Sequence, residues 1–254
     1  MRKSEWDNIT INPIHLIRED GTHGGYWCRE TSPGCRLCSS KSIIENPKLT
    51  YSSYMMENMA RLTRPTNIWI CTRTDIFGDW VQNEWLLHIF KCINQTPKNR
   101  YYVSSKYDRR NFLYNLRWVQ DEMNWIPSLK YGEKKPMTNL YIGITVENQK
   151  MFDERIGRTI YSYEQSWHFL AQQGWKIFYN CTPLLSIVDL KLKQYPVSGV
   201  IVSGEIGGRE VPEDAVIYIK NQCDRAGIPF FFSGWGGKRT DRFLRGEEFL
   251  TLPH

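Results

Sequence analysis

Short apolar runs alternate along this chain with longer segments in which apolar residues recur at helical spacing. We expect the apolar runs to form strands at 8–17, 67–72, 100–104, 139–146, 174–180, 198–203 and 228–232. Between them the pattern predicts helices at 39–62, 80–94, 108–124, from about 149, and 212–225. Strands that are apolar throughout and alternate with helices indicate parallel βαβ units with both sheet faces covered. The predicted class is therefore α/β.

Two kinds of residue define the ends of the predicted helices. Asn148 is suited to cap the helix that begins near Gln149. Pro212 lies at the start of the last long helix, and Gly227 is placed to stop it.

Polar residues follow most of the predicted strands, where the loops of a parallel sheet carry binding and catalysis. Their positions are 72–75, 104–106, 145–148, 180–182, 203–205 and 233–235. Polar residues also cap ordinary helices after strands, so none of them alone identifies a site. The repetition after six strands is the stronger observation.

Composition and charge limit the classes of protein to which this chain can belong. The 254 residues are 41% hydrophobic, which is sufficient for one large α/β domain over 1–254. The start, MRKSEWDNIT, lacks the apolar region of a signal peptide, and no apolar run approaches a membrane span. We therefore expect a cytoplasmic protein without a membrane partner. The net charge of +6 weakly favours a polyanionic partner.

A loop at 26–39, YWCRETSPGCRLCS, places Cys28, Cys35 and Cys38 within eleven residues. Pro33-Gly34 predicts a tight turn just before the second cysteine. Three grouped thiolates suit an iron–sulfur cluster or a zinc ion, and His23 is a possible fourth zinc ligand. A disulfide with one free thiol is the remaining alternative. Spacing alone does not separate these hypotheses.

The other four cysteines are scattered through apolar segments, at Cys71, Cys92, Cys181 and Cys223. We expect them to be buried free thiols, because buried cysteine behaves as a small apolar residue and the cytosol is reducing.

Several motifs in order make the chain resemble a known group. They are C-x6-C-x2-C enclosing SPGC, TDIF at 74–77, GITVEN at 143–148, TPLL at 182–185, VIVSGEIGG at 200–208, GIPFFFSGWGG at 227–237, and LRGEEF near the end. The chain resembles the phage three-Cys-motif family, a radical-S-adenosylmethionine-like group related to spore photoproduct lyase. The resemblance implies a partial (β/α)6-type TIM barrel of the radical SAM kind, with a cluster loop after the first strand. It also implies a 4Fe–4S cluster and S-adenosylmethionine (SAM).

The resemblance assigns roles to particular residues. Cys28, Cys35 and Cys38 match the three cluster ligands, which leaves one iron open to the cofactor. Thr74 and Asp75 match the position that holds the methionyl amino group. Lys106 matches a lysine that binds the methionyl carboxylate, or else is an exposed lysine at a helix start, and Ser105 is a further cofactor-binding candidate. The remaining cofactor-binding candidates are Thr145, Glu147 and Asn148, near the ribose, and Glu205, which could instead cap a loop. Trp235 could cover the barrel mouth or belong to the core.

Three positions depart from the family pattern and concern the substrate. Thr182 replaces a glutamate, Ser233 replaces a lysine, and SKYD at 105–108 replaces TKRP. No catalytic acid, base or hydrogen donor is assigned from the sequence.

The predicted function is that of a radical SAM enzyme. The cofactor is cleaved to a 5′-deoxyadenosyl radical, which abstracts hydrogen from a thymine-derived base in phage DNA, as in hypermodification by isomerisation or lyase-type chemistry. We expect an external electron donor such as flavodoxin or ferredoxin. Candidate phosphate contacts are Arg109, Arg110, Lys238, Arg239 and Arg242. The alternatives are a non-catalytic zinc module that binds nucleic acid, and a radical SAM enzyme that acts on a peptide or small metabolite.

Overall fold

The structure is a computed structural model, and it describes residues 7–40, 44–106, 122, 136–157, 167–195 and 197–254. The chain divides into two compact units. The first comprises Met1–Glu30 and Ser39–Leu140, and the second comprises Thr31–Cys38 and Tyr141–His254. The cysteine loop is thus shared, because Cys28 belongs to the first unit and Cys35 and Cys38 belong to the second.

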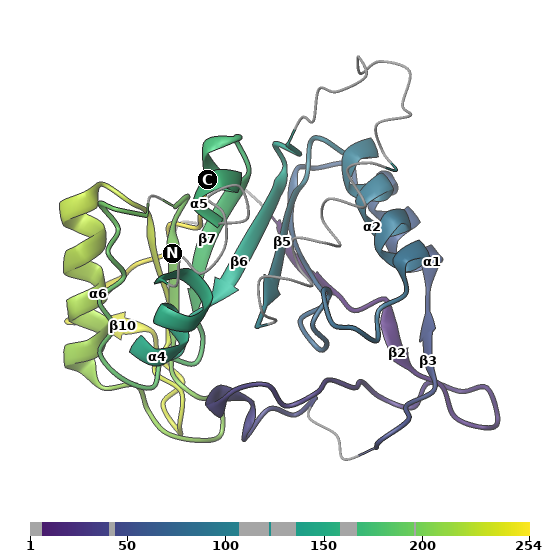
Figure 1. The fold of residues 1–254 in the computed structure, drawn as a ribbon, viewed down its shortest axis with the longest axis horizontal. Helices are drawn as coiled ribbons and strands as arrows, with labels where there is room; N and C mark the ends of the chain where they lie inside the picture. The colour runs from purple at the N-terminus through teal and green to yellow at the C-terminus, as the bar shows by residue number, and fades with distance from the viewer. Residues whose placement is uncertain (1–6, 41–43, 107–121, 123–135, 158–166, 196) are drawn as a thin grey trace. The chain divides into compact units, whose positions relative to one another are not determined.

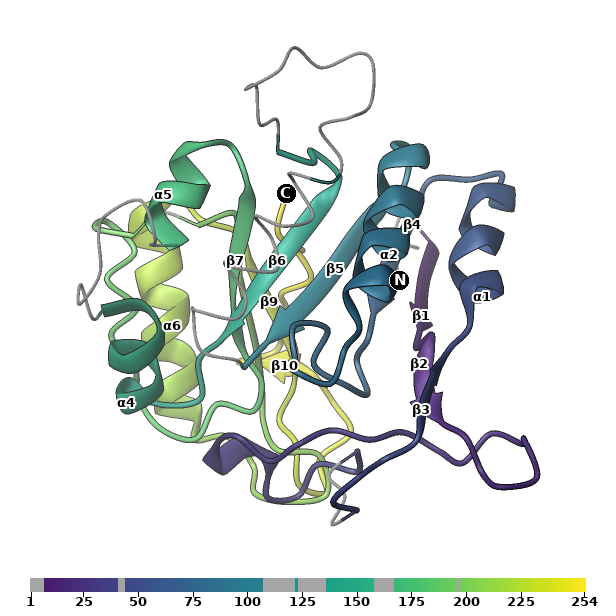
Figure 2. The ribbon, with the colours of Figure 1, turned by 45° about the vertical axis from the view of Figure 1, so that its right-hand side comes forward.

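The first unit contains a parallel sheet in the order β1-β4-β5. Its α2 helix runs alongside β5 (Figures 1 and 2), and buries Leu86, Ile89, Phe90 and Ile93. The elements of this unit are β1 (Asp7–Ile11), β2 (Ile14–Leu16), β3 (Leu49–Tyr51), α1 (Ser53–Glu57), η2 (Asn58–Arg61), β4 (Thr66–Ile70), α2 (Asn83–Gln95) and β5 (Arg100–Ser105).

The second unit contains a parallel sheet in the order β6-β7-β8-β9. Helix α6 lies along one face of it (Figure 1) through Ala215, Val216, Ile219 and Cys223. The elements are η1 (Pro33–Cys35), β6 (Leu140–Thr145), α4 (Gln149–Phe152), the π-helical η3 (Asp153–Gly157), α5 (Trp167–Gln172), β7 (Lys176–Cys181), β8 (Val200–Ser203), α6 (Glu213–Ala226), β9 (Phe230–Gly234), β10 (Phe243–Leu244) and β11 (Glu247–Glu248).

The parallel α/β class is confirmed, but the partial (β/α)6 barrel is wrong. The described residues contain seven parallel strands, three in the first unit and four in the second. Moreover, no helix is described between β7 and β8, so the strand–helix repeat is broken there. Pro183 lies in this connection, and a proline has no amide hydrogen with which to continue a helix.

The predicted first strand, 8–17, is in fact two strands in different sheets. Pro13 interrupts it, and β2 then pairs antiparallel with β3 rather than with the parallel sheet. A cluster loop directly after the first strand is therefore also wrong, because β2 lies between β1 and the cysteines.

The helix predicted over 39–62 is mostly wrong as well. Its described part contains β3, the short α1 and the 3-10 helix η2. Met56 and Met59 are buried there, so the apolar spacing reflected core positions rather than one continuous helix. The helix predicted over 108–124 lies outside the described residues, apart from residue 122.

The predicted helix ends are confirmed. The Asn148 side chain accepts a hydrogen bond of 2.9 Å from the amide of Met151 at the start of α4. Pro212 precedes α6, and Gly227 ends it in the left-handed conformation with φ of 65°. None of the helices within the described residues is long and apolar enough to cross a membrane.

Candidate functional site

The cysteine loop forms the tight turn that Pro33-Gly34 predicts. The amide of Cys35 donates to the carbonyl of Ser32 at 2.9 Å, and the amide of Cys38 donates to the carbonyl of Cys35 at 3.0 Å. Pro33 is the first residue of η1, where its fixed φ is favourable and its missing amide hydrogen costs nothing. The turn therefore keeps Cys35 and Cys38, which are three positions apart in the chain, close together in space.

The three loop thiols differ in exposure and in their hydrogen-bonding neighbours. Cys35 is buried, Cys38 is exposed and Cys28 is intermediate. The Cys35 sulfur lies 3.5 Å from the Ser32 hydroxyl oxygen and 3.9 Å from that of Thr31. The Ser32 hydroxyl donates its one hydrogen to Glu147, so toward Cys35 it acts as an acceptor, and the Thr31 hydroxyl is the one of the two that can donate to this sulfur. Among the described residues, no three cysteine, histidine or acidic side chains converge as a metal-ion site.

None of the seven cysteines forms a disulfide, and the four outside the loop are buried as predicted. Burial raises the pKa of the Cys71 and Cys181 thiols, and it raises that of Cys223 to about 12. These thiols stay protonated and act as apolar core groups. The loop cysteines form no disulfide either, so the alternative of a disulfide with one free thiol is wrong.

Ser32 connects the loop to the end of β6. Its hydroxyl donates a hydrogen bond of 2.7 Å to Oε1 of Glu147, a residue that is fully buried. A side chain at Gly34 would overlap the same carboxylate, so glycine is required where the loop approaches Glu147. The Glu147 carbonyl also accepts from the amide of Leu185, which ties in the segment after β7.

Glu205 is a second buried carboxylate of this unit, only 5% exposed. Its Oε2 accepts from the Arg209 amide at 3.4 Å and lies 3.6 Å from the Arg209 guanidinium Nε. Its Oε1 has no hydrogen-bond partner among the residues that the structure describes. A Cβ at Gly208 would lie 2.6 Å from the Leu37 side chain, so the Glu205 turn adjoins the cysteine loop.

Thr145 and Asn148, the other candidates after β6, are engaged by the chain itself. Thr145 is buried, and its carbonyl accepts a hydrogen bond from the Arg155 guanidinium at 2.5 Å. The side-chain oxygen Oδ1 of Asn148 caps α4. The side-chain NH₂ group of Asn148 is not used by this cap and could donate to a ligand.

Asp75 organises the candidate residues of the first unit. Its Oδ1 accepts from the Ser105 hydroxyl at 2.9 Å and from the amide of Phe77 at 3.1 Å, and its Oδ2 accepts from the amide of Lys106 at 2.7 Å. Thr74 accepts a hydrogen bond of 2.9 Å from the Trp80 indole. These hydrogen bonds of Asp75 bring together the loops after β4 and β5.

Trp235 belongs to the core and does not form an exposed cover over a binding site. It is 1% exposed, and its indole donates to the carbonyl of Phe243 at 3.1 Å. Arg239 lies over its ring at 4.2 Å.

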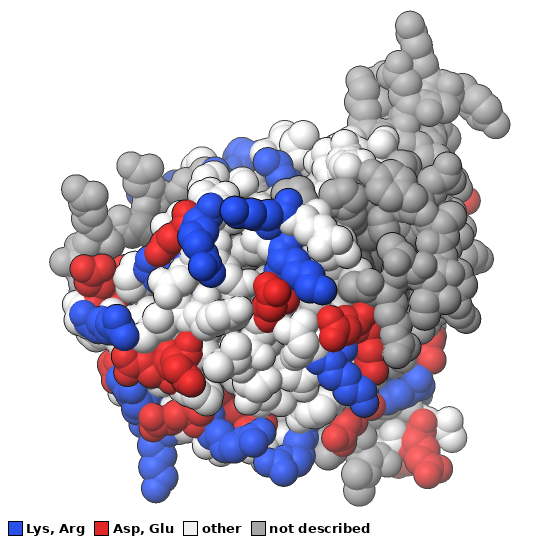
Figure 3. Space-filling model, turned by 60° about the vertical axis from the view of Figure 1, so that its left-hand side comes forward, with Lys and Arg blue, Asp and Glu red and all other residues white. Residues whose placement is uncertain are grey.

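The candidate phosphate contacts are less available than their charge predicts. Arg239 pairs with Asp241 and Arg242 with Glu248, whereas Arg109 and Arg110 lie outside the described residues. Figure 3 shows Lys and Arg side chains interspersed with Asp and Glu over the face that it draws. The net charge of +6 thus does not translate into a single-sign area on that face.

Sequence analysis missed two residues that the structure connects to the candidates. Ser32 stands out only as the first letter of SPGC, although its partner Glu147 lies 115 positions away. Arg155 is a buried arginine, which is unusual enough to mark a specific acceptor, but its burial is not visible in the sequence.

Comparison with known proteins gives a family and no closer relative. No curated protein and no solved structure matches the chain. The family model described as "Protein of unknown function (DUF5131)" matches residues 5–249, nearly the whole length, and the chain belongs to that family.

Proposed function

We propose that this protein is a radical SAM enzyme that modifies or isomerises a thymine-derived base in DNA. One observation carries the proposal: the loop that bears three cysteines is tied through Ser32 to a buried carboxylate at the end of a parallel strand. Polar groups that gather at strand ends are where parallel α/β folds bind cofactors. The type of reaction in this proposal is the one that the resemblance to the phage three-Cys-motif family implies.

The donor types suit an iron–sulfur cluster, although the described side chains do not converge as a metal-ion site. Cys28, Cys35 and Cys38 would supply three soft ligands, and the Thr31 hydroxyl lies 3.9 Å from the Cys35 sulfur, where it could donate to a thiolate. When bound, the reduced cluster would supply the electron that cleaves SAM to the hydrogen-abstracting 5′-deoxyadenosyl radical.

The remaining candidates would bind and orient the cofactor. Oε1 of Glu205 is a buried acceptor without a donor among the described residues, and a hydroxyl or ammonium group would satisfy it. In this proposal the charge of Asp75 attracts the methionyl ammonium, and its carboxylate is held in place by the Ser105 hydroxyl and the Lys106 amide. In this proposal Thr74, Ser105, Lys106, Thr145, Glu147 and Asn148 complete the binding set.

The substrate and setting are the least constrained parts of the proposal. A base in duplex DNA must be flipped out of the stack before it can meet a radical. We assign the reaction to the cytoplasm of a phage host, with flavodoxin or ferredoxin as electron donor, by analogy with the resembled family.

The test is an anaerobic assay. The protein is reconstituted with iron and sulfide, reduced and given SAM with thymine-containing DNA, and 5′-deoxyadenosine is measured. We expect iron and sulfide to be retained, and 5′-deoxyadenosine to form faster when DNA is present. A colourless protein that retains one zinc ion and makes no 5′-deoxyadenosine would overturn the proposal in favour of a zinc module, because grouped thiolates also suit zinc.

A further inference from the structure

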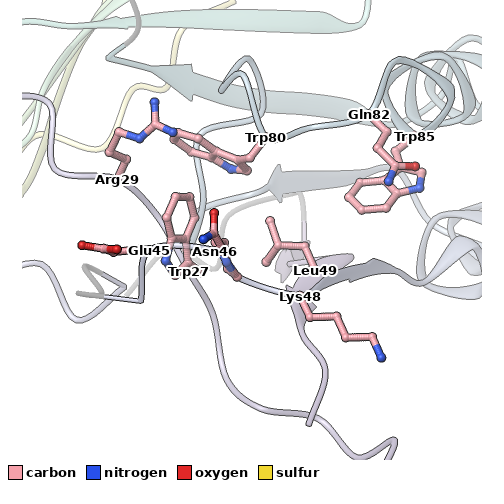
Figure 4. A pocket seen from close by; sticks show the side chains of 10 residues that line it. Trp27, Arg29, Glu45, Asn46, Lys48, Leu49, Trp80, Gln82 and Trp85 are labelled. Carbon is pink, nitrogen blue, oxygen red and sulfur yellow. The ribbon is translucent and has the colours of Figure 1, made fainter. Parts of the chain in front are cut away.

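A pocket of about 480 Å³ lies in the first unit, and none of the residues assigned above to the cluster and SAM lines it, although Trp27 and Arg29 flank Cys28 in the chain. Its walls come from the loop before β3, the loop before α2 and the first turn of α2. Figure 4 shows Trp27 and Trp80 on one side and Trp85 and Gln82 on the other, with Leu49 between them. The volume is in the range of small-ligand sites.

The tryptophans of this pocket are held by the chain. The Trp27 indole donates to the carbonyl of Ile44 at 3.0 Å, and the Trp80 indole donates to Thr74 at 2.9 Å. The two rings meet edge to face at 4.8 Å between centroids. With its N–H group satisfied, Trp80 offers a ligand only aromatic surface, whereas Trp27 is only 5% exposed and serves to fix the orientation of Trp80.

Trp85, on the opposite wall, is supported from behind. Its ring stacks on Tyr51 with centroids 5.9 Å apart and planes 18° apart. The Tyr51 hydroxyl in turn forms a 2.6 Å hydrogen bond with Nδ1 of His88. A preorganised wall loses little conformational entropy when a flat ligand stacks on it.

The polar groups of the pocket are the charged side chains of Arg29, Glu45 and Lys48 and the amides of Asn46 and Gln82. Asn46 and Gln82 are exposed and supply side-chain amides, which match the donor and acceptor edges of bases. A cationic ligand is disfavoured because the guanidinium of Arg29 already lies 5.2 Å over Trp80. Arg29 also pairs with Asp79 at 2.8 Å, so its charge is largely compensated.

We infer that this pocket holds one base of single-stranded DNA, stacked between the tryptophan walls. Exposed residues at the rim, among them Asn46 and Lys48, leave room for the backbone of a strand to pass. Lys48 is the rim cation available for one phosphate. Stacking therefore supplies most of the affinity, with a shallow salt dependence. The inference does not rest on the proposed radical chemistry, because the pocket requires neither cluster nor SAM.

The experiment measures binding of a fluorescent oligothymidylate to the metal-free full chain by anisotropy. We expect Trp85→Leu to weaken binding by about 5- to 100-fold and Trp85→Phe to retain most of it, because a phenyl ring still stacks. Lys48→Ala should lower the slope of log affinity against log salt by about 0.7 while changing affinity modestly. Competition by thymidine monophosphate at the same site would support recognition of the base.

The matched control is Tyr54→Leu, which removes an aromatic ring that is 61% exposed on α1 of the same unit and does not line the pocket. Thermal unfolding of each variant checks that the fold is retained. The inference is overturned if the wild type does not bind the oligonucleotide, if Trp85→Leu binds it as tightly as the wild type, or if duplex DNA binds as tightly as the single strand. Because the assay contains no cluster or SAM, these outcomes are separate from failure of the radical assay.

Discussion

The hydroxyl of Ser32 and the carboxylate of Glu147 lie 2.7 Å apart, although 115 positions separate them in the chain. Both are buried, and the Cys35 sulfur lies 3.5 Å from the same hydroxyl oxygen. The serine thus couples a cysteine of the loop to the carboxyl end of β6. A hydrogen bond to a buried charged group contributes more to stability than one between neutral groups.

Replacing Ser32 with alanine should therefore destabilise the protein by about 1.5–3 kcal/mol, because Glu147 loses a buried donor. Thr31→Ala is the control: the neighbouring threonine is exposed, and we expect a change within about 0.5 kcal/mol. Urea denaturation of both variants measures the difference. Equal stabilities would contradict the importance of the hydrogen bond.

A second prediction concerns two glycines of the turn after β8. A Cβ at Gly204 would overlap the backbone carbonyl of Trp235, whereas a Cβ at Gly207 would meet open space at a φ of 70°. Gly204→Ala should destabilise the fold by about 3 kcal/mol or more, since backbone has to move. Gly207→Ala should cost only about 1–2 kcal/mol of conformational strain. Thermal unfolding gives the order, and the reverse order would contradict the close approach.

Local features of the fold were predictable from sequence because short-range chemistry decides them. Asn148 and Gly227 mark helix ends, and the buried strands are continuous apolar runs. The stretch 39–62 was not predictable in this way, because apolar spacing there also fits a strand followed by short helical turns. Tertiary pairing of β2 with β3 decides that segment, and pairing partners are not visible in a single sequence.

In the candidate site, too, contacts that depend on local features differ from contacts that depend on tertiary pairing. The meeting of Asp75 with Ser105 and Lys106 follows from parallel strands that end at one edge of a sheet, and the sequence had placed these residues after two such strands. The link from Ser32 to Glu147 depends on where a long loop returns. The tryptophan pocket likewise joins residues from three separate segments, none of which forms a motif.

A third prediction tests the cluster ligands. Cys35→Ala should lose iron and sulfide on reconstitution while keeping the turn, because backbone hydrogen bonds hold that turn. Cys223→Ala is the control, since burial keeps that thiol protonated within α6. Iron and sulfide content with visible absorbance measures both. Full cluster absorbance in Cys35→Ala would remove Cys35 from the ligand set.

A fourth prediction follows from the pair His15 and His23, whose rings stack at 4.3 Å. Desolvation, followed by repulsion from His23, lowers the pKa of His15 below the usual histidine value. The unfolded chain then binds a proton at His15 more readily than the folded chain does. Stability should fall as the pH drops from about 6.5 through the lowered pKa of His15.

Urea denaturation above and below that pH measures the loss for the wild type and for His15→Asn. We expect the smaller loss in the variant, because it no longer titrates at this position. The edge of Tyr26 faces His23 at 5.2 Å and is kept in both proteins. An identical pH dependence in the two proteins would contradict the assignment to His15.

The last prediction separates two roles of Asp75. Asp75→Ala leaves the Ser105 hydroxyl and the amides of Phe77 and Lys106 without their acceptor, so it should destabilise the protein by about 2–4 kcal/mol. Asp75→Asn keeps one acceptor oxygen and should lose less stability, yet it removes the charge that would bind the methionyl ammonium. Asp79→Asn is the control, because Asp79 is exposed and paired with Arg29, and such pairs contribute about 1 kcal/mol or less.

Urea denaturation and equilibrium dialysis with SAM on cluster-loaded protein measure the two roles independently. We expect Asp75→Asn to keep its cluster and most of its stability while SAM binding weakens about tenfold or more, which is the effect of losing one charge-assisted hydrogen bond. Unchanged SAM affinity in Asp75→Asn would exclude the ammonium role and leave Asp75 as the residue that joins the loops after β4 and β5. Unchanged stability in Asp75→Ala would instead contradict the hydrogen-bond network itself, because three donors cannot lose a buried acceptor without cost.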